Sequence, residues 1–276
     1  MSSILTNNGA MVALQTLKGI NANMARTQNE ISTGKSVATA KDNAAVWAIA
    51  KTMEADVASF KGIRDSLAMG SATVGVAREA TESIADLLKE IKVKIVAAQE
   101  DNVDKGKIQT DIEALRDQIA TVVGSAQFNG LNMLNGEAEN PVSVLASLDR
   151  ANDGTVAASH IEVATVDLTL DGELSDLADI DVTDDAKAAL GAIDALIATA
   201  IDTAAAFGSA QKRIDIQASF VGKMSDAMTT GIGAMVDADM EEVSARLQAL
   251  QVQQQLATQS LSIANQAPQN ILQLFR

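Results

Sequence analysis

Proline is nearly absent from this sequence, and its scarcity is the strongest constraint on how the chain can fold. The only prolines are Pro141 and Pro268. No residue from 1 to 140 therefore interrupts a helix by lacking a backbone N–H or by clashing with the preceding turn. Because apolar residues also recur at alternating intervals of three and four in this stretch, the sequence predicts long helices that pair lengthwise.

The first apolar stripe runs from residue 10 to residue 31, and its spacing is that of an a/d coiled-coil seam. Its members are Ala10, Ala13, Leu17, Ile20, Met24, Thr27 and Ile31. Gly34 then predicts a helix stop. Thr39 and Asp42 predict a capping box that opens the next helix, from about residue 43 to 99.

A matching stripe occupies the C-terminal segment, which is predicted to be helical from about Asp239. Its members are Val243, Leu247, Leu250, Gln254, Ala257, Leu261 and Ala264. A second stripe on the same segment consists of Val252, Leu256 and Ile263. Since a helix that is apolar on two sides usually has neighbours on two sides, the terminal helices are expected to pair with each other and with further partners.

The middle of the chain has a different texture. Alternating apolar residues, with hairpin-turn signals at 152–154 and 171–172, predict a small β element over about residues 141–172. Helix returns near Thr183 or Asp184. The predicted fold class is mainly α: a long antiparallel coiled-coil or helix bundle with a small β-hairpin.

Composition excludes several classes of function. The chain has no cysteine and one histidine, which argues against a disulfide scaffold, a thiolate zinc site or a Ser-His-Asp hydrolase. The net charge of −15, of which −12 falls in residues 137–185, argues against nucleic-acid binding. No stretch approaches ~20 apolar residues, so no membrane span is expected. We expect no enzyme activity, no catalytic residues, no cofactor and no metal.

Three segments resemble the signatures of bacterial flagellins. Residues 31–50 read ISTGKSVATAKDNAAVWAIA, and residues 126–135 read AQFNGLNMLN, which is similar to the family's FNG turn. The C-terminal stretch 262–276 reads SIANQAPQNILQLFR, and its ANQ-x-PQN-x-L element is highly specific. The opening residues and the context of Trp47 look alphaproteobacterial.

The resemblance implies a filament subunit for swimming motility that is secreted and resides in the extracellular flagellum. Residues 1–42 and 240–276 would form the inner-tube domain D0, and residues 43–239 the rod domain D1. Too few residues remain for outer domains D2 and D3. The implied partners are further copies of the chain, the flagellar cap, junction proteins, an export chaperone and the type III export apparatus.

On this resemblance, the stripes and the C-terminal signature are expected to form the core seam and the subunit interface. The residues are Ala10, Ala13, Leu17, Ile20, Met24, Ile31, Val243, Leu247, Leu250, Leu261, Ala264, Asn265, Gln266, Pro268, Gln269, Asn270 and Leu274. Glu90 and Lys94 stand where family members that bind an innate immune receptor have Arg and Leu. Both replacements are expected to weaken that recognition.

A second reading stays open on sequence alone. A hook–filament junction protein shares the same terminal helices as a flagellin. The ending ILQLFR and the intact NQAPQN element favour the filament subunit.

Overall fold

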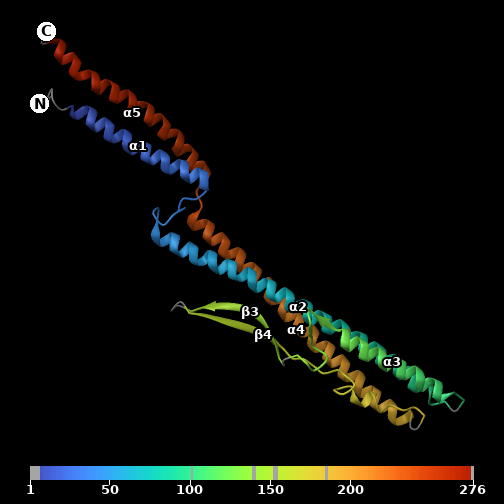
Figure 1. Ribbon diagram of the computed structural model, residues 1–276. Coiled ribbons are helices and arrows are strands. Elements are labelled where there is room, and N and C mark those ends of the chain that lie inside the picture. Colours follow the sequence, from blue (N-terminus) through green and yellow to red (C-terminus); the bar gives the residue numbers. More distant parts are fainter. Residues whose placement is uncertain (1–6, 101, 139–140, 152–154, 184–185, 275–276) are drawn as a thin grey trace. The chain divides into compact units, whose positions relative to one another are not determined.

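A computed structural model describes residues 7–100, 102–138, 141–151, 155–183 and 186–274, with side chains up to Gln266 in the last helix. Five helices dominate it (Figure 1). They are α1 (Asn8–Thr33), α2 (Ala44–Ala97), α3 (Lys105–Ser125), α4 (Ala186–Val236) and α5 (Met240–Leu274). The prediction of a mainly helical chain with a small β-hairpin is confirmed.

Residues with typical capping roles fix both ends of α1. The Asn7 side chain accepts a hydrogen bond from the Ala10 N–H, which satisfies one of the free donors at the helix start. Gly34 ends the helix in the left-handed conformation (φ 69°), and its N–H donates to the Glu30 carbonyl. The predicted stop at Gly34 is confirmed.

The start of α2 differs from the prediction. Asp42 does accept hydrogen bonds from the Thr39 N–H and hydroxyl, at 2.9 and 3.0 Å, but this pair only closes a turn before the helix. Asn43 is the residue whose side chain caps α2, because its Oδ1 accepts from the Val46 N–H at 3.2 Å. The interpretation of Thr39 and Asp42 as the capping box of this helix is therefore wrong.

Helices α2 and α4 run antiparallel and bury a continuous heptad seam. On α2 one set of buried positions alternates at three and four residues, and it consists of Phe60, Ile63, Leu67, Gly70, Val74, Ala77, Thr81, Ile84, Leu88, Ile91 and Ile95. On α4 the fully buried residues Ile193, Ala200, Phe207, Ile214 and Val221 recur every seven residues. This is the spacing that keeps one side of each helix turned to its partner.

Polar contacts fix the pairing of these two helices. Ser71 donates to Asp215 at 2.9 Å, and Lys92 pairs with Asp194 at 2.6 Å, so residues further along α2 meet residues earlier on α4. Helix α3 is capped by Asp104, whose side chain accepts a hydrogen bond from the Lys107 N–H. Its Gln109 side chain holds the segment that precedes α4, because it donates to the Ile180 carbonyl and accepts from the Val182 N–H.

The β structure consists of two antiparallel hairpins. Strands β1 (Gln127–Phe128) and β2 (Leu131–Asn132) flank a turn in which Asn129 and Gly130 both have positive φ. Strands β3 (Val142–Arg150) and β4 (Val156–Val163) form the larger hairpin, with an irregularity between Leu145 and Ser147. The turn signal at 152–154 lies outside the described residues.

The last part of the predicted β element, residues 164–172, is not a strand. Residues 164–172 form a loop, in which the Val166 and Leu168 N–H groups donate to the Met133 and Leu134 carbonyls. These two hydrogen bonds hold the loop against residues 133–134 without forming a β-ladder, and Leu168 is buried there. The chain then turns at Gly172 and enters the short 3-10 helix η1 (Ser175–Leu177). The alternation of apolar residues in 164–172 therefore reflects the packing of a loop and not a β-strand.

The chain divides into two compact units. Unit 1 comprises Met1–Val57 and Ala227–Arg276, and unit 2 comprises Ala58–Asp226. The only tryptophan, Trp47, is half-buried in unit 1. The paired helices α1 and α5 belong to unit 1, and the long heptad seam of α2 and α4 belongs to unit 2.

Candidate functional site

The predicted stripe on α1 lies on the side of the helix that is shielded from solvent. Ala10, Ala13, Leu17, Ile20, Met24 and Ile31 are half-buried, and Thr27 is buried. Most residues between them are exposed. The stripe faces α5, with which α1 makes its extensive contacts.

The matching stripe on α5 is the complementary side of the pair. Val243 and Leu250 are buried, whereas Leu247, Leu261 and Ala264 are half-buried. Asn265 and Gln266 are exposed. The side chains of Pro268, Gln269, Asn270 and Leu274 lie outside the described residues.

Direct polar contacts set the register of the antiparallel pair. Near one end, the Asn7 side-chain amide donates to the Ala264 carbonyl at 2.7 Å. In the middle, the Gln254 amide donates to the Asn21 side-chain oxygen at 2.7 Å. A one-residue slip of either helix would break both contacts, so the seam has one preferred alignment.

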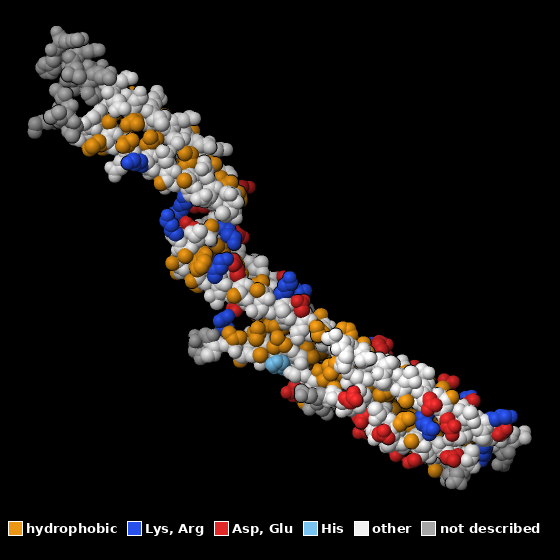
Figure 2. Space-filling view, viewed as in Figure 1, with side chains coloured by type: hydrophobic (Ala, Val, Ile, Leu, Met, Phe, Trp, Pro, Cys, Tyr) orange, Lys and Arg blue, Asp and Glu red, His pale blue; other side chains and the backbone are white. Residues whose placement is uncertain are grey.

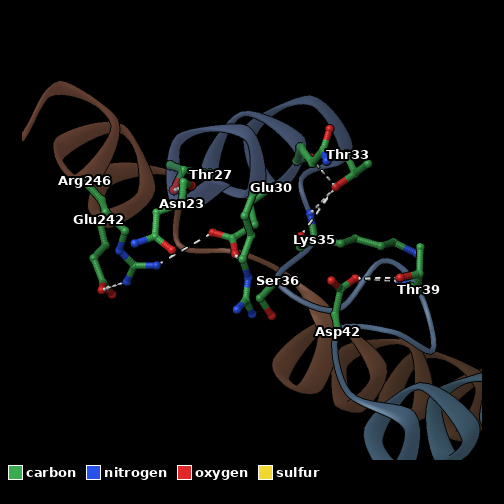
Figure 3. Close-up of polar contacts among 12 residues, drawn as sticks. Asn23, Thr27, Glu30, Thr33, Lys35, Ser36, Thr39, Asp42, Glu242 and Arg246 are labelled. Atoms are coloured by element: carbon green, nitrogen blue, oxygen red, sulfur yellow. Dashed lines mark hydrogen bonds and ion pairs between the residues drawn. The ribbon is translucent and has the colours of Figure 1, made fainter. Parts of the chain in front are cut away.

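A charged cluster closes the other end of the pair, as Figure 3 shows. Glu30 of α1 is buried to 8% exposure, and its carboxylate lies 3.2 Å from Arg26 Nε and 3.7 Å from Arg246 Nη1 of α5. Arg246 also pairs with Glu242 on its own helix. A buried carboxylate is costly unless paired, so Glu30 ties the two helices together at this point. Sequence reasoning missed Glu30, because a single acid inside an apolar stripe carries no pattern.

The two connections between helices are bonded to each other. Ser36 donates to the Val236 carbonyl through its N–H at 2.7 Å and its hydroxyl at 3.1 Å. The Ala238 N–H returns a hydrogen bond to the Gly34 carbonyl at 2.9 Å. The segments that leave α1 and α4 are thus joined within unit 1.

Electrostatics around the connections favour charged carboxylates. The N–H and hydroxyl of Thr39 lower the pKa of Asp42 by hydrogen bonding to its charged form. The ammonium of Lys51 lowers the pKa of Glu54 in the same way, with Lys35 as a further cation at 3.8 Å. In the described part of the chain, no group of three or more His, Cys, Asp or Glu side chains is arranged to hold a metal ion.

Both terminal helices also expose large apolar side chains to solvent. On α5 these are the predicted second stripe, Val252, Leu256 and Ile263, which are 55 to 64% exposed. On α1 they are Met11, Val12 and Leu14, which the sequence reasoning did not single out. Figure 2 shows apolar side chains at the surface of this pair, whereas acidic side chains gather over unit 2. Exposed apolar surface of this kind marks an interaction site.

The two receptor-motif residues lie on α2 within unit 2. Glu90 is exposed. Lys94 is half-buried, and its Nζ lies 2.6 Å from Asp111 Oδ2 of α3. The hydrogen bond to Asp111 raises the pKa of Lys94, so its positive charge is held at this surface.

One finding differs from the expectation of no membrane span. By length and composition alone, α4 is long and apolar enough to cross a membrane. Its apolarity has another physical role, because Ile193, Phe207 and Ile214 are buried in the core of unit 2. The expectation was based on the lack of a continuous run of ~20 apolar residues, whereas α4 is apolar only on average over its length.

Two family models match the chain, one in its N-terminal half and one in its C-terminal part. Residues 4–139 match the bacterial flagellin N-terminal helical region, and residues 190–275 match the flagellin C-terminal helical region. The chain is 40% identical to Flagellin FljK of Caulobacter vibrioides, aligning over all of this chain and 99% of that protein. It is 40% identical to a flagellin of Brucella melitensis and 39% identical to Flagellin C of Rhizobium meliloti, with all of both chains covered in each case.

Proposed function

The chain belongs to the bacterial flagellin family, whose members polymerise into the flagellar filament, and from this premise we propose that the α1–α5 pair is the element that holds subunits together. The protein is a structural subunit of the extracellular filament that serves motility, and it is not an enzyme. The full-length relatives are flagellins, which favours the filament subunit over the hook–filament junction protein.

The observation that carries this proposal is the two-sided apolar surface of the terminal helices. One side of each helix is used within the pair, and the other leaves Val252, Leu256 and Ile263 of α5 in solvent. Removing apolar surface from water contributes roughly 25 cal/mol per Å². In a polymer of identical chains, neighbouring copies can pack against this exposed apolar side of α5 and remove it from water.

The seam and interface residues are assigned on that basis. The stripes of α1 and α5 form the internal seam of each subunit. The C-terminal residues Asn265, Gln266, Pro268, Gln269, Asn270 and Leu274 extend this element toward neighbouring subunits. The family resemblance at this signature supports the assignment.

We assign residues 1–42 and 240–276 to an inner-tube domain D0, and residues 43–239 to a rod domain D1. The helix breaks at 34–43 and 237–239 support these limits. The compact units change over at Val57 and Ala227, inside α2 and α4, so the first turns of α2 and the last turns of α4 belong to the same unit as the terminal helices. Family membership further suggests a flagellar cap, junction proteins, an export chaperone and the type III export apparatus as partners.

Lysine substitutions in the seam test the proposal. Leu17→Lys and Leu261→Lys each place a charge between α1 and α5, where an unpaired charge costs several kcal/mol. We expect filaments to be lost while the helical content and thermal unfolding of unit 2 are kept. Matched controls are Gln15→Lys and Ser260→Lys, which change exposed neighbours.

Elongation from filament fragments, followed by sedimentation and electron microscopy, provides the measurement. The controls should elongate like the unmodified chain. Normal filaments from both seam variants would contradict the assignment of the seam.

We also propose that Glu90 and Lys94 weaken recognition by the innate immune receptor that binds other family members. Glu90 reverses a contact charge, and Lys94 carries a charge that Asp111 holds in place. Glu90→Arg with Lys94→Leu is expected to raise signalling by monomeric protein in a receptor reporter assay. Potent activation by the unmodified monomer would refute the proposal.

A further inference from the structure

Asparagine followed directly by glycine occurs three times in the chain, at residues 8–9, 129–130 and 135–136. This dipeptide is chemically labile, because glycine has no side chain to keep its backbone nitrogen away from the asparagine amide. The first pair lies in the opening turn of α1, in unit 1. The other two lie in unit 2, before and after strand β2, so their surroundings can be compared directly.

The Asn129–Gly130 pair forms the turn between β1 and β2 and is open to solvent. Both residues are exposed, and nothing lies within 4 Å of a Cβ added to Gly130. Within the described part of the chain, neither the Asn129 amide nor the Gly130 N–H forms a hydrogen bond. Asn129 has a φ of 51°, the only positive value at a described residue other than glycine. The backbone and side chain of this asparagine are therefore free to rotate.

The Asn135–Gly136 pair is held by its neighbours. The Asn135 amide donates to the Glu137 carboxylate at 2.8 Å, and its side-chain oxygen accepts from the Glu137 N–H at 3.1 Å. Behind the glycine, a Cβ added to Gly136 would lie 2.7 Å from Asp167 Oδ2. Asp167 is itself fixed, because its Oδ1 accepts from the Thr169 N–H and hydroxyl at 3.0 and 2.6 Å. The two carboxylates also oppose the loss of the Gly136 N–H proton, since like charges repel.

From this contrast we propose that Asn129 is a site of spontaneous deamidation in the folded chain and that the fold protects Asn135. The Gly130 nitrogen loses its proton and attacks Cγ of Asn129. A C–N bond forms, and the side-chain nitrogen leaves as ammonia, which closes a five-membered succinimide ring. Water then opens the ring at either carbonyl and gives aspartate or isoaspartate. The reaction is a hydrolysis, so water is its only co-reactant.

The product changes the turn in two ways. Either form adds a negative charge to unit 2, over which acidic side chains already gather (Figure 2). Isoaspartate also lengthens the backbone of a two-residue turn by one methylene group. On the far side of β2, the buried Asn132 side chain donates to the Val123 carbonyl at 2.7 Å and accepts from the Leu134 N–H at 2.8 Å. These bonds confine the change to the turn.

Ageing the full-length monomer in mildly alkaline buffer tests the proposal, because hydroxide promotes the loss of the glycine N–H proton. Trypsin releases residues 117–150 as one peptide, since no Lys or Arg lies between Arg116 and Arg150. Fragmentation in a mass spectrometer then locates the conversion at Asn129 or Asn135 within the same peptide. We expect conversion at Asn129 to be several-fold faster in the folded chain. In guanidinium chloride, where the contacts are lost, the two rates should become similar.

Three variants separate the contacts from the sequence. Glu137→Ala removes the partner of the Asn135 amide and should raise conversion at Asn135 several-fold, whereas the matched control Glu100→Ala, at an exposed acid just after α2, should leave it unchanged. Asn129→Gly keeps a residue suited to positive φ and should abolish most of the isoaspartate. An isoaspartyl methyltransferase with labelled S-adenosylmethionine measures that product.

The outcomes are decisive in either direction, and none depends on polymerisation. Equal rates at the two asparagines in the folded chain would overturn the proposal. So would conversion at Asn129 that occurs only in guanidinium chloride. A rate ratio that stays the same after unfolding would show that the contacts of Asn135 give no protection.

Discussion

Units 1 and 2 both contain a heptad repeat, but the repeat is buried to different extents in the two units. In unit 2, the seam residues of α2 and α4 are fully buried, with Leu67, Ile84, Leu88 and Ile193 at 0% exposure. In unit 1, the seam residues of α1 are half-buried, and the second apolar side of α5 faces solvent. A seam that is buried within one copy stabilises that copy by itself. A seam that is only half-buried still has apolar surface whose burial on assembly lowers the free energy.

Charge separates the units in the same way. Unit 2 carries 28 acidic and 14 basic residues, whereas unit 1 carries eight and seven. Like charge repels when copies are brought together, and salt screens that repulsion only where water reaches it. The near-neutral unit is therefore the one suited to close packing with its neighbours.

The largest expected effect of this contrast is in amide hydrogen exchange of the monomer. Local opening is easiest where few apolar side chains are buried. Amides of α1 and of α5 after Leu250 should exchange orders of magnitude faster than those of α2 between residues 63 and 95. Mass spectrometry of peptide fragments checks this, and equal protection in the two units would remove the contrast.

One substitution made in both seams sharpens the comparison. Leu88→Ala empties a fully buried site in unit 2 and should lower the free energy of unfolding by about 2–5 kcal/mol. Leu17→Ala, at a half-buried site in unit 1, should cost the monomer about 1 kcal/mol or less, because part of this side chain already contacts water. Chemical denaturation of the two variants gives the values, and a larger loss for Leu17→Ala would break the comparison.

A glycine substitution probes how tightly unit 2 is packed. An added Cβ at Gly70 would lie 2.6 and 2.8 Å from the two methyl groups of Val144, so Gly70→Ala should destabilise the protein by about 1–3 kcal/mol. Gly62→Ala is the matched control on the same helix, since nothing lies within 4 Å of its added Cβ. It should stabilise by about 0.5–1 kcal/mol. Thermal unfolding distinguishes the two, and equal shifts would contradict the tight seat of β3 on α2.

The smallest effect is a difference in pH response. Asp42 and Glu54 in unit 1 have pKa values lowered by folding, so their contribution is present at neutral pH and is lost as pH falls through the folded pKa values, below about pH 4. Lys94 in unit 2 has a raised pKa, so its contribution is present at neutral pH and is lost as pH rises through the folded value. Acid should first weaken the Asp42 and Glu54 contacts of unit 1. Alkali should weaken the contact between Lys94 of α2 and Asp111 of α3 in unit 2. Asp42→Asn and Lys94→Gln, followed by site-specific NMR, check each arm.

Sequence periodicity predicted the helices well because one buried side of a long helix leaves a regular trace. The stop at Gly34 was also predictable, since a glycine in the left-handed conformation satisfies the local backbone by itself. Residues 164–172 were mistaken for strand because their alternation comes from contacts with Met133 and Leu134, far away in sequence. The pairing of Glu30 with Arg246 was out of reach for the same reason.

The exposed residues of α1 show a further limit. Met11, Val12 and Leu14 follow no single stripe, so only the accessible surface of the folded chain reveals them. Likewise, the irregularity between Leu145 and Ser147 shifts the side-chain alternation of β3 by one residue. Such shifts leave no signal in hydropathy.

The position of Trp47 in unit 1 makes the two units spectroscopically distinct. With no tyrosine in the chain, indole is the dominant fluorophore, and unit 2 contributes only the weak emission of phenylalanine. Fluorescence therefore follows events around the start of α2, whereas far-ultraviolet circular dichroism reports on the helices of both units. The difference between the two signals, recorded on one unmodified sample, separates the melting of each unit without any label.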